Sequence, residues 1–196
     1  MKQQKSSFSE ILLIAGLILA AGLCRLITNE LQWWNFNAIG ASALFGGVVI
    51  KNKRLSYILP LATLFLTDLC FQLFTNIQGF YGAQMFFVYG AFLLITFIGT
   101  QLKKINALTI FLTAIGTGLL FFLISNFGVW VLSNMYPHTA SGLMACYAAA
   151  IPFFRNDMFG NFLLNTIMGS VCYSAVLFGA YALVKRIAIK PQGQLA

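Results

Sequence analysis

Charged side chains are scarce in this chain: they make up 8% of its 196 residues, and only four residues are acidic. Soluble domains carry roughly 25% charged residues, so this composition excludes an ordinary water-soluble fold. Hydrophobic residues account for 60% of the chain, which is typical of a polytopic membrane protein. No polar stretch between the apolar runs exceeds about a dozen residues, which leaves no room for a soluble catalytic or nucleotide-binding domain. We therefore expect residues 1 to 196 to form a single transmembrane domain.

Histidine and clustered cysteine are also lacking. His138 is the only histidine, and the four cysteines Cys24, Cys70, Cys146 and Cys172 lie in different segments without a CxxC pair. This spacing indicates neither a metal site nor a disulfide framework, and favours cysteine as a small packing residue. Because no second histidine or adjacent nucleophile accompanies His138, we expect a turn residue or ligand contact there, and neither enzyme activity nor a cofactor.

The basic residues indicate a membrane topology. The net charge is +8, but a nucleic-acid binder concentrates its Lys and Arg on one polar face, whereas here they punctuate apolar runs, so no nucleic-acid partner is expected. Basic residues are retained in the cytoplasm during insertion. The clusters assigned to that side are Lys2 and Lys5, then Lys51, Lys53 and Arg54, then Lys103 and Lys104, and finally Lys185, Arg186 and Lys190. Only Arg25 and Arg155 fall on the outer side.

Six apolar stretches are long enough to cross a bilayer, which takes about 20 residues. They are residues 8 to 28, 33 to 50, 55 to 74, 81 to 100, 105 to 125 and 156 to 184, and the second is the weakest because its strictly apolar part begins only at Ala38. The first stretch could also be a cleaved signal peptide, which would leave five spans. We expect six transmembrane helices in a bacterial inner membrane, with both termini cytoplasmic.

The outer connection over residues 126 to 155 is unusually long. It contains a second apolar stretch, residues 143 to 154, which is too short to span. A run of about 10 to 14 apolar residues is typical of a re-entrant or interfacial helix. We expect this segment to cap a cavity in the outer half of the protein.

Two charged residues lie at similar heights in the predicted spans. Asp68 lies about 20 Å along the third span, and Arg25 lies about 26 Å along the first, which is a similar height. An unpaired charge at the bilayer centre costs roughly 2.5 to 3.5 kcal/mol, so both should face protein or water. We expect Arg25 and Asp68 to share one interior, either as an ion pair that fixes helix packing or as contacts to a polar ligand.

Aromatic and amide side chains gather on the outer side. All three tryptophans lie there, whereas a belt at the membrane interfaces would occupy both sides. An interfacial belt and a pocket for a planar organic ligand both fit this set, which comprises Trp33, Trp34, Asn35, Asn37, Asn126, Trp130, Tyr136, His138 and Tyr147. Beyond it, Asn156 or Asp157 suits a helix cap, and Arg155 suits a carboxylate, a phosphate or a lipid headgroup.

A stripe of small residues lies on the first span. Gly16, Ala20 and Cys24 recur at every fourth position, and such stripes let helices approach closely in lipid. The partner helix could belong to this chain or to another subunit.

Several stretches resemble a family of six-helix bacterial proteins described as putative transport proteins, which is similar in architecture to the substrate-binding S components of energy-coupling-factor (ECF) transporters. The matching stretches are Asn37 to Ala41, Leu44 to Gly47, Leu59 to Leu61 with Thr67 and Asp68, Phe121 to Phe122, Asn126 to Trp130, Tyr136 to Pro137, Gly142 to Leu143, Cys146 to Tyr147, and Ile151 to Asn156. The resemblance implies solute binding at the outer side and a separate transmembrane coupling subunit with two ATPases. It also implies that the stripe at Gly16, Ala20 and Cys24 contacts that subunit.

From these observations we expect a membrane subunit that binds a small, vitamin-like organic solute for uptake and is coupled to a separate ATP-driven module. The residues expected to line its site are Asn37, Asp68, Asn126, Trp130, Tyr136, His138, Arg155 and Asn156. Two alternatives remain open. One is an intramembrane or lipid-modifying enzyme that uses His138, Arg155 and Asp157, and the other is an accessory subunit that does not transport.

Overall fold

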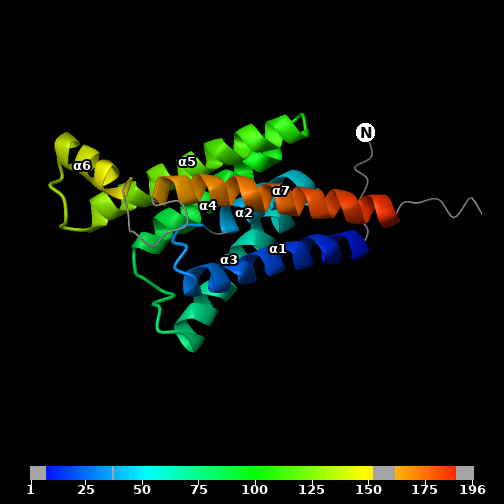
Figure 1. Ribbon diagram of the computed structural model, residues 1–196, viewed down its shortest axis with the longest axis horizontal. Coiled ribbons are helices and arrows are strands. Elements are labelled where there is room, and N and C mark those ends of the chain that lie inside the picture. The colour runs from blue at the N-terminus through cyan, green and yellow to red at the C-terminus, as the bar shows by residue number, and fades with distance from the viewer. Residues whose placement is uncertain (1–7, 37, 152–161, 189–196) are drawn as a thin grey trace, which may run out of the picture.

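The computed structural model describes residues 8 to 36, 38 to 151 and 162 to 188, and in this part of the chain it contains seven helices and no strand (Figure 1). The helices are α1 (Phe8–Glu30), α2 (Ile39–Val49), α3 (Lys53–Phe74), α4 (Gln84–Gln101), α5 (Ala107–Leu132), α6 (Ala140–Ala150) and α7 (Phe162–Ala188).

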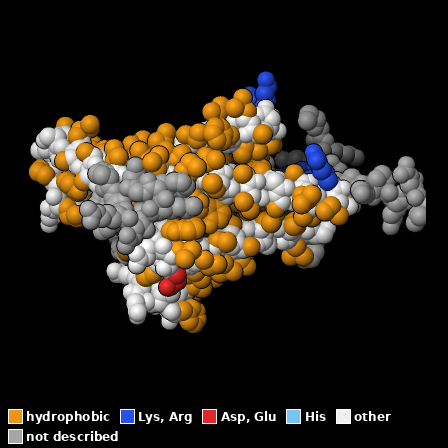
Figure 2. Space-filling model, viewed as in Figure 1, with side chains coloured by type: hydrophobic (Ala, Val, Ile, Leu, Met, Phe, Trp, Pro, Cys, Tyr) orange, Lys and Arg blue, Asp and Glu red, His pale blue; other side chains and the backbone are white. Residues whose placement is uncertain are grey.

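Five of these helices, α1, α3, α4, α5 and α7, are long and apolar enough to cross a membrane. Their outward faces carry large hydrophobic side chains, among them Leu19, Phe65, Phe97 and Leu112. A water-soluble monomer does not expose apolar surface on this scale. Figure 2 shows that hydrophobic side chains cover much of the flank of the bundle. The chain is therefore a multi-pass membrane protein.

Helix α2 differs from the predicted span. It begins at Ile39 rather than Trp33, because residues 31 to 35 form turns in which Gln32 and Asn35 have positive φ. Its 11 residues rise about 16 Å, which is about half of a bilayer core. All residues from Ile39 to Gly47 are buried. The second apolar run thus forms a short central helix surrounded by the long ones.

The segment between the fifth and last predicted spans is mostly helical. Helix α5 continues seven residues past its predicted end, to Leu132, and α6 covers Ala140–Ala150 within the predicted capping segment. The hydroxyl of Thr139 caps α6 by accepting from the Gly142 amide at 3.1 Å. Residues 152 to 155 of this segment and residues 156 to 161 of the last predicted span lie outside the described residues.

Glycines set the closest helix contacts. A Cβ at Gly47 of α2 would lie 2.3 Å from the Thr96 carbonyl oxygen of α4, and one at Gly99 would lie 2.7 Å from the Leu44 carbonyl oxygen. A Cβ at Gly22 of α1 would lie 2.2 Å from Thr63 Cγ2 of α3. Small residues at these crossings let the backbones approach each other without lipid between them.

The basic residues between the helices gather at one end of the bundle, which we call the basic end. There the start of α1 meets the end of α7, where Lys185 Nζ lies 2.9 Å from Glu10 Oε1. Lys51 lies at the same end and lines a cavity together with Lys185 and Arg186. In Figure 2 the visible Lys and Arg side chains lie toward this end, close to where Figure 1 marks the N-terminus.

Candidate functional site

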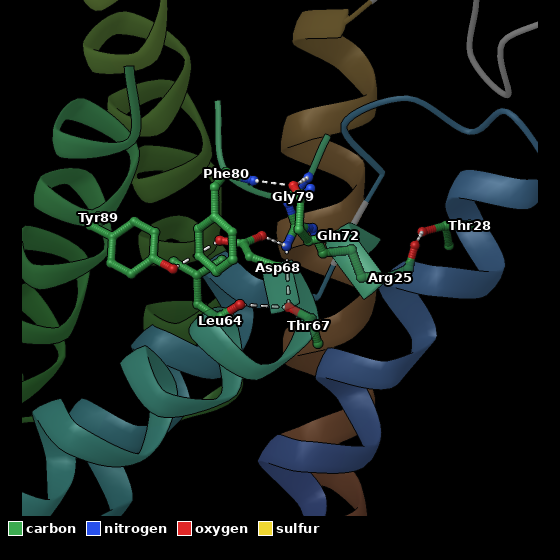
Figure 3. A network of polar contacts seen from close by, with 9 residues as sticks. All are labelled: Arg25, Thr28, Leu64, Thr67, Asp68, Gln72, Gly79, Phe80 and Tyr89. Atoms are coloured by element: carbon green, nitrogen blue, oxygen red, sulfur yellow. Dashed lines mark hydrogen bonds and ion pairs between the residues drawn. The ribbon is translucent and has the colours of Figure 1, made fainter. Parts of the chain in front are cut away.

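A fully buried carboxylate lies at the centre of the candidate site (Figure 3). Asp68 of α3 is 0% exposed, and both of its carboxylate oxygens are engaged. Arg25 of α1 pairs with Oδ1, and the hydroxyl of Tyr89 on α4 donates to Oδ2 at 2.9 Å. Three helices therefore meet at one charge. Such a group is tolerated inside a membrane only when paired in this way.

Arg25 reaches Asp68 because α1 and α3 cross closely one turn earlier, at Gly22 and Thr63. Its Nη1 also donates to the Thr67 hydroxyl at 3.1 Å, and its Cζ lies 4.9 Å from the centre of the Phe71 ring. The Arg25 side chain keeps 20% of its surface exposed. Within the described part of the chain, the hydrogen bonds of the guanidinium all use Nη1, so its Nε and Nη2 donors remain for a further acceptor.

The loop between α3 and α4 folds directly onto Asp68. Gln72 Oε1 accepts from the Gly79 amide at 3.2 Å, which holds the loop against α3. A Cβ at Gly79 would lie only 1.8 Å from the Asp68 carbonyl oxygen, so only glycine fits at this position. Burial and the nearby Asp68 charge raise the pKa of Tyr81, also in this loop, to about 12. The Tyr81 hydroxyl is protonated at neutral pH, as in any ordinary tyrosine, and can donate a hydrogen bond.

A second group, of aromatic side chains, joins α5 to α6. Trp130 Nε1 donates to the Pro137 carbonyl at 2.9 Å, and the Trp130 and His138 rings lie 5.5 Å apart edge to face. Trp130 also packs on Phe127, with ring centres 5.5 Å apart. These contacts hold the turn before α6 against the end of α5. Trp130 and His138 are thus engaged with each other and with the local backbone.

Helix α4 lies between the two groups. Tyr89 binds Asp68, while Phe87 on the same helix packs against Phe127 with ring centres 6.1 Å apart. Gln84 at the start of α4 donates to the Ser125 carbonyl of α5 at 2.7 Å. One helix therefore contacts both the Asp68 pair and the α5–α6 aromatic group.

A known protein family matches nearly the whole chain. The model described as "Family of unknown function (DUF6580)" matches residues 5 to 192. The chain belongs to the DUF6580 family. No curated protein and no solved structure matches it. The match carries no link to S components, so that resemblance stays a prediction.

The predicted site residues of this DUF6580 member fall into separate places. The structure brings Arg25 and Asp68 into direct contact, and it brings Trp130 of α5 together with His138, which lies with Tyr136 in the connection between α5 and α6. Asn126 donates to its own helix, at the Phe122 carbonyl 2.8 Å away. Asn37, Arg155 and Asn156 lie outside the described residues, as does Asp157. Asp68, Asn126, Trp130, Tyr136 and His138 do not line the three cavities that lie beside Lys185, Phe92 and Phe74 in the described part of the chain.

Sequence reasoning missed two tyrosines near the buried charge, Tyr89 and Tyr81. A signal for Tyr89 is present, because a tyrosine within an apolar helix needs a partner for its hydroxyl and Asp68 is the only acid well inside a predicted span. Among the described residues, no group of three or more His, Cys, Asp or Glu side chains could hold a metal ion. In this DUF6580 site Arg25, Asp68 and Tyr89 form an ion pair and a hydrogen bond, and Tyr81 lies beside them.

The predicted contact stripe on α1 faces outward. Gly16 and Ala20 are exposed, and a Cβ at Gly16 would meet nothing within 4 Å. Cys24 is half-buried. Gly16 and Ala20 are therefore open to lipid or to another subunit.

Proposed function

We propose that this protein is the solute-binding membrane subunit of an uptake system, coupled to a separate transmembrane subunit and ATPases. The observation that supports this function best is the buried Asp68 carboxylate, paired with a partly exposed arginine that has donors to spare. An ionisable group inside a membrane domain marks a functional site by default, because insertion selects against it otherwise. The tyrosines beside the pair add hydrogen-bonding groups with aromatic faces, which suits a small, vitamin-like organic solute.

The proposed topology has six crossings, with both termini in the cytoplasm of a bacterium. The turns over residues 31 to 35 together with α2 supply the crossing that α2 is too short to make alone. With the basic end on the cytoplasmic side, as the positive-inside rule requires, the Asp68 pair lies in the outer half of the bilayer. Asp68 is 15 residues past Lys53, or about 22 Å from the basic end of α3. A solute that enters from the outer side would therefore reach the Asp68 pair before it reaches the basic end.

The test is native mass spectrometry of the protein purified in mild detergent, to find a bound small molecule. Arg25→Lys keeps the positive charge that Asp68 needs but removes the planar fork of donors. Trp130→Ala removes the largest ring of the aromatic group, and Phe86→Ala, at an aromatic that is 81% exposed, is the matched control. We expect a solute that survives Phe86→Ala and is lost in Arg25→Lys. Loss of the solute in Trp130→Ala alone would mean that the site lies at α5 and α6 instead.

A non-transporting accessory subunit is the second candidate, and the outward face of Gly16 and Ala20 favours it. It predicts a protein that holds no solute and that co-purifies with another membrane subunit. That result in the same experiment would replace the proposal above. Gly16→Leu would then break the complex without changing the fold, because a side chain there meets open space.

A further inference from the structure

A large cavity at the basic end takes no part in the candidate site. Its volume is about 1050 Å³, and it lies between the first turns of α5 and the second half of α7, with Val48 and Val49 of α2 at its back. This volume is at the upper end of the roughly 300 to 1,000 Å³ usual for small-molecule sites. The cavity is big enough for an organic molecule of lipid size.

The cavity exists because α5 and α7 diverge. The two helices touch where Gly118 meets Ile167, since a Cβ at Gly118 would lie 3.1 Å from the Ile167 Cα. From this crossing they separate toward the basic end, as Figure 1 shows. Phe111 on α5 and Phe178 on α7 then line opposite sides of a gap. Both helices are membrane spans by length and composition, and Phe111 at the gap is 48% exposed, so the gap opens toward the hydrocarbon of the bilayer.

The walls are apolar and the mouth is basic. Lys51, Lys185 and Arg186 stand at the mouth with one acid, Glu10. Lys185 is neutralised by Glu10 at 2.9 Å, and the Tyr181 hydroxyl donates to the same carboxylate oxygen at 2.6 Å. Lys51 and Arg186 have no ion-pair partner in the described part of the chain. Two cationic side chains are thus left at the mouth of an apolar cavity.

The N-terminus of α5 adds to the positive potential at this mouth. Asn106 caps the helix by accepting from the Thr109 amide at 2.8 Å, and Asn106 and Ala107 line the cavity. The free amides in the first turn of a helix carry a partial positive charge and bind phosphate groups well. The mouth therefore combines Lys51, Arg186 and a helix N-terminus around one space.

We propose that this cavity binds one anionic phospholipid, with its phosphate at Lys51, Arg186 and the start of α5 and an acyl chain between Phe111 and Phe178. A lipid fits better than a soluble solute because the gap opens sideways to the bilayer and its walls are apolar. The basic end belongs to the cytoplasmic leaflet by the positive-inside rule, and that leaflet is rich in anionic lipids. The bound lipid fills the gap that α5 and α7 leave beside α2 and so supports the short central helix.

The chain offers matched variants for a test. Lys51→Gln with Arg186→Gln removes the two mouth charges, and Lys103→Gln with Lys104→Gln removes two exposed charges close by in the chain that do not line the cavity. Gly179 lines the cavity and a Cβ there meets nothing within 4 Å, so Gly179→Leu fills the cavity without a backbone clash. Gly116→Leu, at an equally open glycine outside the cavity lining, is its control.

The experiment is native mass spectrometry of the protein released from nanodiscs that contain equal amounts of phosphatidylglycerol and phosphatidylcholine. The wild type should retain one phosphatidylglycerol. The mouth variant should lower the preference for phosphatidylglycerol about tenfold or more, while the Lys103 and Lys104 variant keeps it. Gly179→Leu should lose the retained lipid and Gly116→Leu should keep it. Equal retention of both lipids, no retained lipid in the wild type, or a retained lipid in Gly179→Leu would overturn the proposal.

Discussion

The Asp68 pair allows a direct measurement of what a buried charge contributes to this fold. Asp68→Asn removes the negative charge and leaves the Arg25 guanidinium next to Thr67 and Phe71 without its counter-ion. Breaking one side of a buried pair costs about 3 to 5 kcal/mol. Because 20% of the Arg25 side chain is exposed to solvent, we expect the free energy of unfolding to fall by about 3 kcal/mol, the lower end of this range. For a chain of this length, that corresponds to a drop in Tm of roughly 6 to 12 °C.

The companion variant replaces both partners with apolar side chains, Arg25→Met with Asp68→Leu. Exchanging a whole buried pair for packed hydrophobic residues is often neutral or stabilising. We therefore expect the double variant to be more stable than Asp68→Asn, with a Tm close to that of the wild type. Thermal unfolding in detergent, followed by tryptophan fluorescence, measures all three proteins. An unchanged Tm in Asp68→Asn, or a double variant less stable than the single one, would refute the reasoning.

Three further predictions use the same unfolding assay. Tyr89→Phe should lower the free energy of unfolding by about 1 to 3 kcal/mol, because it leaves Asp68 Oδ2 buried without the hydroxyl that donates to it at 2.9 Å. A loss below about 0.5 kcal/mol would mean that another donor replaces the Tyr89 hydroxyl. Gly79→Ala should strongly destabilise the protein, because its Cβ would lie 1.8 Å from the Asp68 carbonyl oxygen. The control Gly90→Ala should have little effect, because a Cβ at Gly90 meets nothing within 4 Å. Equal effects of the two variants would contradict the position of the loop against Asp68. Ser174→Ala should be neutral or stabilising, because Ser174 is 1% exposed and its hydroxyl has no partner among the described residues. Ser56→Ala should instead cost about 1 kcal/mol, because it loses the 2.8 Å hydrogen bond to the Lys53 carbonyl.

The long helices could be predicted from hydropathy because lipid selects on length and composition alone. The predicted spans 55 to 74 and 81 to 100 differ from α3 and α4 by three residues or fewer at each end. The span 33 to 50 was too long, since the turns at Gln32 and Asn35 keep Trp33 and Trp34 out of α2. Hydropathy does not separate an apolar turn from an apolar helix, so this boundary was not visible in the sequence.

The charge pair could also be predicted, because charges within spans must find partners and only Arg25 and Asp68 stood at matching heights. The aromatic set was harder. Its members share the outer side of the protein. Their contacts depend on side-chain rotamers, which spacing along the chain does not fix. Examples are the edge-to-face contact of Trp130 with His138 and the hydrogen bond from Asn126 to the Phe122 carbonyl. The cavity at the basic end depends on the divergence of α5 from α7, which is a tertiary feature with no local sequence signal.

The most direct test of the proposed function is whether the stable double variant Arg25→Met with Asp68→Leu still retains the solute that co-purifies with the wild type. Native mass spectrometry of the two proteins, prepared side by side, gives the answer. We expect a folded variant that has lost the solute, because the pair supplies the polar contacts of the site. A folded variant that keeps the solute would show that Arg25 and Asp68 only hold α1, α3 and α4 together, and would contradict the account.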